Sequence, residues 1–216
     1  MLSYYTRPLS AHIYTGGEDK NLYINSLLLG TCRMQLCGHT QRISGIATYM
    51  GGPQYPSCVI SSSWDETIRI WKVDDCFLEA KNTTAVATVS DSWRTLKGHT
   101  NRICSVKVFL VHPSHKKGAR NPAAEDASED DEGSYPMIAS GSTDGSIKIW
   151  NFQYLGNNEF NTDCLFTIFD ELNITWYLCL EFIYTRQDGH LLVSGSKDNF
   201  VRVRREGNGI VCDASV

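Results

Sequence analysis

The sequence predicts an all-β protein made of four repeats of one antiparallel unit, because three features recur along the chain. The first is an aspartate placed six residues before the end of an alternating apolar segment, as in "SSSWDETIRIW" (61–71) and "ASGSTDGSIKIW" (139–150). The second is a run of small residues before this aspartate, and the third is a Gly-His phrase upstream. Alternation with period two is typical of a strand, and a short polar turn between two such runs predicts a β-hairpin.

The first unit, residues 1–40, is a weak copy of this pattern. Its hairpin is "YTGGEDKNLYIN" (14–25), with Asp19 at the turn and Asn25 where the better copies end in tryptophan. Terminal repeats are often atypical. We therefore expect a degenerate first unit.

The second unit (41–96) and the third unit (97–168) are the complete copies. The phrases "CGHTQRISGIATY" (37–49) and "KGHTNRICSVKVF" (97–109) align without a gap upstream of the two hairpins. Each unit reads as strand, Gly-His turn, strand, loop, strand, aspartate turn and strand, which gives four strands per unit. Asp65 and Asp144 are 79 residues apart, which is longer than the repeat and predicts insertions at 74–92 and 112–135.

The second insertion, residues 112–135, is basic in its first half, acidic in its second half and poor in apolar residues. Such a segment cannot bury enough apolar surface to order itself, so we expect a disordered acidic loop. Ser128 is followed by Glu129, Asp130 and Asp131, which resembles an acid-directed kinase site. A phosphate there would add to an already negative run.

The fourth unit, residues 169–216, keeps the hairpin as "VSGSKDNFVRVR" (193–204) with Asp198 at the turn. Leu172 stands where the complete copies have histidine, and Arg204 stands where they have tryptophan. We therefore expect a degenerate unit that cannot form the same polar contacts.

From about residue 11 to residue 205, these phrases resemble the WD40-repeat family. The resemblance implies that each unit is one blade of a β-propeller, in which four-stranded sheets pack face to face around a central channel. It also implies a hydrogen-bonded structural set in each complete blade. These sets are His39, Ser61, Asp65 and Trp71, and His99, Ser140, Asp144 and Trp150.

A physical reason supports these sets. A buried histidine ring must be oriented, a buried indole N–H needs an acceptor and a buried carboxylate needs donors, and one network meets all three needs. The alternative is a hydrolytic Asp-His-Ser triad, but the sets repeat once per unit and no serine lies on a nucleophile elbow. We therefore expect no enzyme activity, no cofactor and no metal site.

Members of this family usually close a ring of about seven blades. This chain supplies four units, so we expect an incomplete or open propeller. The alternatives are a closed four-bladed ring and a truncated fragment of a longer WD40 protein with no independent function. Open blade faces would expose apolar surface, which predicts self-association through them.

The resemblance also indicates which side chains reach the face where the Gly-His and aspartate turns gather. They are Arg42, Ser44 and Trp64 in the second blade, Arg102, Cys104 and Thr143 in the third, and Thr175, Tyr177 and Lys197 in the fourth. Arginine pairs bidentately with carboxylate or phosphate, and aromatic residues are common in interface hot spots. This set suits an acidic or phosphorylated peptide, and the alternative is ordinary scatter of surface residues.

Most members of the resembled family are interaction platforms, so we expect a noncatalytic scaffold that assembles other proteins into a complex. The alternative is an RNA-associated subunit. The net charge is −4, and it becomes +2 without the six acidic residues of 125–132, so no extended basic surface for direct nucleic-acid binding is predicted.

The sequence also bears on location. It has no apolar run of roughly 20 residues that could span a bilayer, and "MLSYYTRPLSAH" at its start lacks the apolar stretch of a secretory signal. We expect a cytoplasmic or nuclear protein that is not secreted. The eight cysteines should then be thiols, and none is arranged as C-x-x-C for zinc.

Overall fold

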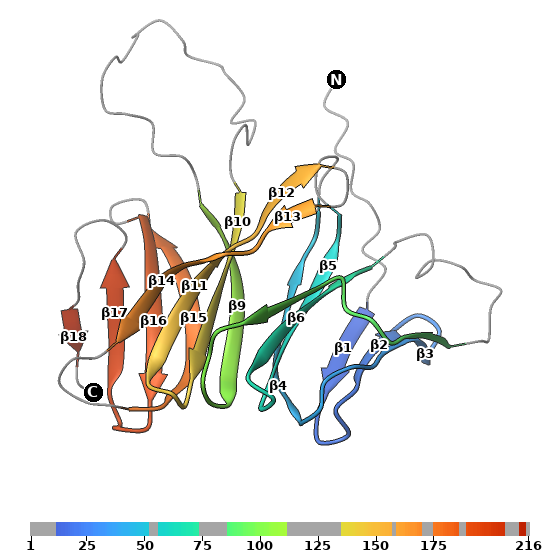
Figure 1. The fold of residues 1–216 in the computed structure, drawn as a ribbon, viewed down its shortest axis with the longest axis horizontal. Coiled ribbons are helices and arrows are strands. Elements are labelled where there is room, and N and C mark those ends of the chain that lie inside the picture. Colours follow the sequence, from blue (N-terminus) through green and yellow to red (C-terminus); the bar gives the residue numbers. More distant parts are fainter. Residues whose placement is uncertain are drawn as a thin grey trace, which may run out of the picture.

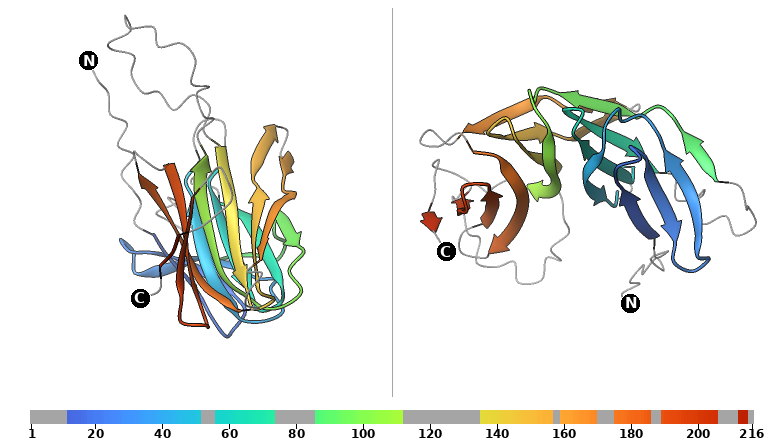
Figure 2. Two further views of the ribbon diagram at one scale, coloured as in Figure 1. Left: turned by 90° about the vertical axis from the view of Figure 1, so that its left-hand side faces the viewer. Right: turned by 90° about the horizontal axis from the view of Figure 1, so that it is seen from below.

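The structure is a computed structural model that describes residues 12–51, 56–73, 86–111, 135–156, 159–169, 175–185, 189–205 and 212–214. Within these ranges the regular secondary structure consists entirely of strands, which form four four-stranded sheets and one two-stranded ribbon. The four large sheets stand side by side in an open arc (Figure 1; Figure 2). The predicted all-β fold, with four four-stranded units in an incomplete or open propeller, is confirmed.

Each sheet is described from the inner side of the arc outward. The first contains β1 (His12–Gly16), β2 (Leu22–Ser26), β3 (Thr31–Leu36) and β7 (Ala87–Val89). The second contains β4 (Ile43–Tyr49), β5 (Cys58–Ser63), β6 (Thr67–Lys72) and β8 (Arg94–Lys97).

The third sheet contains β9 (Ile103–Val111), β10 (Tyr135–Ser142), β11 (Ser146–Asn151) and β14 (Cys164–Phe169). The ribbon β12 (Gln153–Gly156) and β13 (Glu159–Asn161) lies between its last two strands in sequence. The fourth sheet contains β15 (Tyr177–Thr185), β16 (Gly189–Ser196), β17 (Val201–Arg205) and β18 (Cys212–Ala214).

The insertion at 74–92 is divided by the structure. Residues 74–85 lie outside the described residues, but Ala87–Val89 form β7, which pairs parallel with β3 of the first sheet. The other described strand pairs in the molecule are antiparallel. The insertion therefore reaches back from the second unit to cover the outer edge of the first sheet.

The insertion at 112–135 is described only at Tyr135, where β10 begins. The expected disordered loop and the expected phosphorylation site at Ser128 otherwise lie outside the described residues. No segment of the described chain forms a helix that could cross a membrane.

The core lies in three interfaces between neighbouring sheets, which we call the first, second and third seams in chain order. Trp71, Leu22 and Ile24 pack in the first seam, and Trp150 and Ile138 pack in the second. The third seam holds Tyr177, Leu180 and Ile147. A sheet that contributes to a seam on each side must be apolar on both faces.

Strand β5 shows how the sequence meets this need. Val59 packs in the first seam and Ile60 in the second, because successive side chains of a strand point to opposite faces. All six residues of β5 are buried. The strand therefore lacks the alternation of polar and apolar residues that is typical of a strand with one face in solvent. A continuous run of small and apolar residues is what a strand buried on both faces requires.

The four aspartate hairpins point to one side of the molecule, which is the lower side in Figure 1. The residue after each aspartate has a positive φ angle of 67° at Lys20, 69° at Glu66, 83° at Gly145 and 68° at Asn199. Only glycine adopts this left-handed region without steric cost. The turn geometry is therefore the same in all four units, although only the third unit has a glycine at the position with positive φ.

This turn gives a test of the repeat geometry. Glu66→Gly should raise the free energy of unfolding by about 0.5–1 kcal/mol, because relief of the left-handed strain exceeds the extra chain entropy of glycine. The reverse change, Gly145→Ala, should lower it by a similar amount. Urea unfolding followed by tryptophan fluorescence measures both, and a loss of stability in Glu66→Gly would contradict the shared turn geometry.

Candidate functional site

The second sheet holds a buried chain of polar side chains. Trp71 Nε1 donates to Ser61 Oγ at 2.8 Å, Ser61 Oγ lies 2.8 Å from His39 Nε2, and His39 Nδ1 lies 2.8 Å from Asp65 Oδ2. Thr67 Oγ1 donates to the other carboxylate oxygen of Asp65 at 2.6 Å. The structure thus brings together all the members of this set that the sequence indicated.

The third sheet repeats this arrangement. Trp150 Nε1 donates to Ser140 Oγ, Ser140 Oγ contacts His99 Nε2, and His99 Nδ1 contacts Asp144 Oδ2, each at 2.8 Å. Ser146 Oγ donates to Asp144 Oδ1 at 2.7 Å, where the second sheet has a threonine. Two independent copies therefore place their atoms alike.

The aspartate at one end of this chain and the tryptophan at the other determine which atom donates in each hydrogen bond. An ionised aspartate can only accept, so His39 Nδ1 carries the proton, and in this tautomer Nε2 accepts from the Ser61 hydroxyl. The Ser61 oxygen then accepts from the indole N–H, which can only donate. Every polar atom along the chain is satisfied, which a buried network requires.

The charge of the aspartate is also stabilised. Burial alone would raise the pKa of Asp65, but hydrogen bonds from His39, Thr67 and the backbone N–H of Thr40 outweigh it and hold the pKa well below its usual range. The pKa of Asp144 is lowered in the same way, against burial, by His99, Ser146 and the N–H of Thr100. Both carboxylates are therefore ionised acceptors at neutral pH.

The glycine of the Gly-His phrase has a steric role. Gly98 has a φ angle of 154°, and a Cβ atom there would lie 3.2 Å from the ring of Trp150. The histidine turn and the strand-end tryptophan therefore approach each other more closely than a larger residue would allow.

These sets are poorly placed to act on a substrate. Ser61 and Ser140 are fully buried, and the two histidine side chains are at most 1% exposed. A hydroxyl that contacts no solvent and is already shared between an indole and an imidazole cannot meet an incoming ligand. Among the described residues, no group of three or more histidine, cysteine, aspartate or glutamate side chains is arranged to hold a metal ion.

The fourth sheet satisfies its aspartate with an arginine in place of the histidine of the complete units. Arg202 Nη2 pairs with Asp198 Oδ2 at 2.6 Å, and Arg204 Nη1 donates to Ser194 Oγ at 2.8 Å. Leu172 lies outside the described residues. Two arginines therefore take over contacts that histidine and tryptophan make in the complete units, and one of them, Arg204, is a residue that the sequence comparison had treated as a departure.

The first sheet retains part of the same chain. Asn25 Nδ2 donates to Thr15 Oγ1 at 3.4 Å, in the position of the tryptophan-to-serine bond. Asp19 accepts from the hydroxyl of Tyr23 at 2.7 Å. A side chain at the end of the strand that follows the aspartate turn therefore donates to a hydroxyl of the preceding strand in all four sheets.

On the side of the aspartate turns, arginine and tryptophan side chains stack across the sheets. The guanidinium carbons of Arg42 and Arg102 lie 4.4 Å and 4.2 Å from the centre of the Trp64 ring. Arg42 Nη1 also pairs with Glu18 Oε1 at 2.7 Å. These contacts link the first three sheets across their turns.

The fourth sheet contributes a similar pair, in which the sequence indicated Lys197 but missed Trp176 by one residue. Backbone N–H groups of Trp64, Thr143 and Lys197 donate to the carbonyls of Arg42, Arg102 and Trp176, respectively. Trp176 is therefore the counterpart of the two arginines. The Lys197 ammonium lies 3.7 Å from the centre of the Trp176 ring.

Thr175 and Tyr177, which the sequence placed on this face, are buried. Tyr177 is fully buried in the third seam, where its hydroxyl accepts from Arg204 Nη2 at 3.1 Å. We therefore correct the expected contact surface by replacing Thr175 and Tyr177 with Trp176. The alignment failed because this unit lacks the Gly-His phrase that fixes the register in the others.

The remaining expected contact residues have structural contacts. Ser44 Oγ donates to the carbonyl of Ile103 and so joins the second and third sheets. Thr143 Oγ1 donates to the carbonyl of Arg102 at 3.3 Å. Burial raises the pKa of the Cys104 thiol although Arg102 and Arg42 lie nearby and oppose the change.

We call the exposed or half-buried set on this side the rim. It consists of Glu18, Arg42, Trp64, Arg102, Thr143, Trp176 and Lys197. The rim carries three cations and two large aromatic rings on adjacent turns. Such a surface can bind anionic groups and stack against flat or apolar ones.

Comparison with known proteins agrees with this geometry. Residues 30–72 and 90–151 match the family model described as "WD domain, G-beta repeat". A protein of Fusarium vanettenii named nuclear distribution protein PAC1 is 28% identical over 144 residues, which cover 67% of this chain and 25% of that protein.

Proteins of the same name from Arthroderma benhamiae and Trichophyton verrucosum are each 24% identical over 196 residues. The matches cover 91% of this chain and 33% of each relative. The chain thus spans a quarter to a third of the length of these curated relatives.

The buried sets make a first prediction for this site. Asp65→Ala and Asp144→Ala should each lower the free energy of unfolding by about 1–3 kcal/mol, because each leaves buried donors without an acceptor. Asp91→Ala is the matched control, since Asp91 is exposed. Denaturant unfolding measures the three variants, and equal losses in all of them would contradict the network.

The pKa shifts make a second prediction. Because the folded pKa of Asp65 and of Asp144 lies below the unfolded value of about 3.9, their contribution is complete above that value and is lost as the pH falls below it. The free energy of unfolding should therefore fall as the pH is lowered from about pH 4, by up to about 1.4 kcal/mol per pH unit for each group. Asp65→Asn should show a shallower fall, and parallel curves for wild type and variant would contradict the assignment.

Proposed function

Because this chain belongs to the WD40-repeat family, we propose that it is a noncatalytic scaffold whose rim binds an acidic or phosphorylated peptide of a partner protein. WD40 domains in general bind other proteins and are in general noncatalytic. The observation that carries the proposal is the contact of Trp64 with two arginines from neighbouring sheets. Because both arginines contact the same indole ring, their guanidinium groups lie close together on one surface.

The arginines of the rim are arranged for anion binding. A guanidinium that stacks on an aromatic ring is held in one orientation and keeps donors along its edge for a bidentate carboxylate or phosphate. The ion pair of Arg42 with Glu18 is exposed, with 40% and 78% of the two side chains accessible. Exposed pairs contribute little stability, so a ligand anion can replace Glu18 at small cost.

Trp176 and Lys197 extend the same surface to the fourth sheet. Trp176 is 44% exposed, so its ring can contact an apolar residue of the peptide. A peptide with acidic or phosphorylated residues at its centre and an apolar residue at one end would use both halves of the rim.

The faces at the two ends of the arc give the scaffold a second means of association. Ile183 and Val201 of the fourth sheet are 48% and 39% exposed, and their counterparts in the third sheet, Phe109 and Ile147, pack in a seam. Self-association through these faces therefore remains part of the proposal.

We propose a cytoplasmic or nuclear location.

Fluorescence anisotropy tests the rim directly. A labelled peptide with alternating glutamate and phosphoserine should bind the full chain, and Arg102→Ala should weaken it by at least about tenfold, because a charge-assisted hydrogen bond contributes roughly 1.5–3 kcal/mol. Lys72→Ala is the matched control, since Lys72 also lies over a tryptophan, Trp93, but belongs to no rim contact.

The same samples separate the alternatives. Tighter binding of a labelled RNA oligomer, with a steep fall in affinity as salt is added, would favour the RNA-associated function. Light scattering after size exclusion shows whether the chain pairs with itself. Equal weakening by Arg102→Ala and Lys72→Ala, or no binding of the acidic peptide, would refute the proposal for the rim.

A further inference from the structure

The side chain at the end of the strand that follows the aspartate turn differs between the seams. Trp71 and Trp150 are 1% and 2% exposed and fill the first and second seams. In the fourth sheet the same position holds Arg204, which donates to Ser194 Oγ as the two indoles donate to their serines. The hydrogen bond is kept, but the large apolar ring is not.

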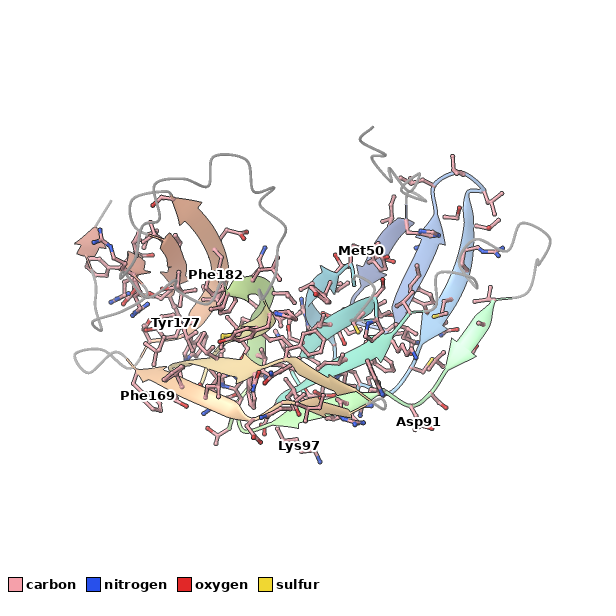
Figure 3. All side chains as sticks on the ribbon, turned by 90° about the horizontal axis from the view of Figure 1, so that it is seen from above. Met50, Asp91, Lys97, Phe169, Tyr177 and Phe182 are labelled. Atoms are coloured by element: carbon pink, nitrogen blue, oxygen red, sulfur yellow. The ribbon has the colours of Figure 1, made fainter. Side chains whose placement is uncertain are left out.

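The third seam accordingly contains a pocket of about 420 Å³. Apolar side chains of both sheets line it, including Met137, Phe166 and Leu192, and its charged lining residues are Arg204 and Arg205. The stacked rings of Phe109 and Phe182, with centres 3.9 Å apart, also line it. Tyr177 and Phe182 lie between the third and fourth sheets in Figure 3.

The outer edge of the third sheet borders this pocket. Strand β14 is the last strand of its sheet, and no described strand pairs with its other edge. Its apolar residues Leu165, Phe166 and Phe169 are 40%, 63% and 62% exposed, and Phe169 lies at the end of the strand (Figure 3). An exposed apolar edge strand is a site where another strand can pair.

The first sheet shows what such a pairing does. Strand β7 pairs with the outer edge of β3, and its side chains Ala87 and Val89 pack against the core of the first seam. Met34 of β3, the counterpart of Phe166 by strand register, is 5% exposed, whereas Phe166 is 63% exposed. Among the described strands, the outer edge of β3 is thus covered by an added strand, whereas the equivalent edge of β14 is not.

We infer that β14 and the third-seam pocket bind an extended segment of a partner protein, with large apolar residues at alternate positions and an acidic residue beside them. The segment would pair with the edge of β14, as β7 pairs with β3. Alternate side chains of an added strand point to the same face of the sheet, so two of them would enter the pocket where the tryptophan is absent. The inference deepens the proposed scaffold function but uses a surface separate from the rim.

The charge of the site sets the remaining requirement. Arg204 and Arg205 place positive charge at the fourth-sheet wall of an otherwise apolar pocket. A carboxylate on the bound segment would complement this charge, whereas a lysine would be repelled. An acidic-apolar segment is therefore favoured over a basic-apolar one.

A peptide that alternates phenylalanine with threonine and ends in two aspartates tests the inference on the full chain. It should bind, and Phe166→Ser should weaken it by at least about tenfold by removing an apolar contact. Arg204→Trp should abolish binding, because the indole would fill the pocket as Trp150 fills the second seam. Hydrogen exchange should slow at the backbone amides of 164–169 on binding.

Two control variants distinguish this site from the others. Leu28→Ser removes an apolar side chain that is 82% exposed in the first unit and should leave binding unchanged. Trp64→Ala disrupts the rim and should weaken the phosphopeptide but not this peptide, so failure of one site is separable from failure of the other. Absent binding, unchanged binding in Arg204→Trp, or loss of binding in Trp64→Ala would overturn the inference.

Discussion

The bond from the end of the strand that follows the aspartate turn to a hydroxyl of the preceding strand is the interaction on which the rest of the molecule depends. In the complete units the serine that accepts it also donates to histidine, and the histidine donates to the turn aspartate. One continuous chain of hydrogen bonds thus ties the hairpin, the Gly-His turn and the strand end together. Because every donor and acceptor in it is satisfied, the polar groups can be buried between apolar sheets.

The size of the donor at this position then controls packing between sheets. An indole supplies both the N–H and enough apolar volume to fill a seam, whereas a guanidinium supplies the N–H without that volume. The first two seams hold the buried rings of Trp71 and Trp150, whereas the third, which has Arg204 at this position, contains a pocket. A single residue type therefore links the internal hydrogen bonding of a sheet to the surface it offers its neighbours.

The two proposed binding surfaces differ in the forces that they use. The rim presents cations on aromatic rings at the turns, where water is accessible and charge attracts an anionic peptide. The edge of β14 and its pocket present backbone groups and apolar volume, where burial supplies most of the binding free energy. A scaffold with two such surfaces can hold two segments of different chemistry at once.

Much of the architecture was predictable from local pattern. The fixed spacing from Asp65 to Trp71 and from Asp144 to Trp150, with period-two alternation between them, specified hairpins that form from neighbouring residues. The same spacing and the Gly-His phrases carry the resemblance to the WD40-repeat family, and that resemblance implied which side chains share a buried set. The hairpin spacing is local in sequence and recurs in all four units, so the residues alone predicted the hairpins.

What the tertiary structure decided depended on contacts between distant residues. The pairing of β7 with β3 joins segments about fifty residues apart, and no pattern within either segment specifies a parallel partner. The register of Trp176, the use of Arg202 and Arg204 in place of histidine and tryptophan, and the pocket beside Arg204 followed only from the packing of the fourth sheet on the third. Sequence periodicity fixes which face of a strand is apolar, but the shape left between two packed faces depends on the side chains of both.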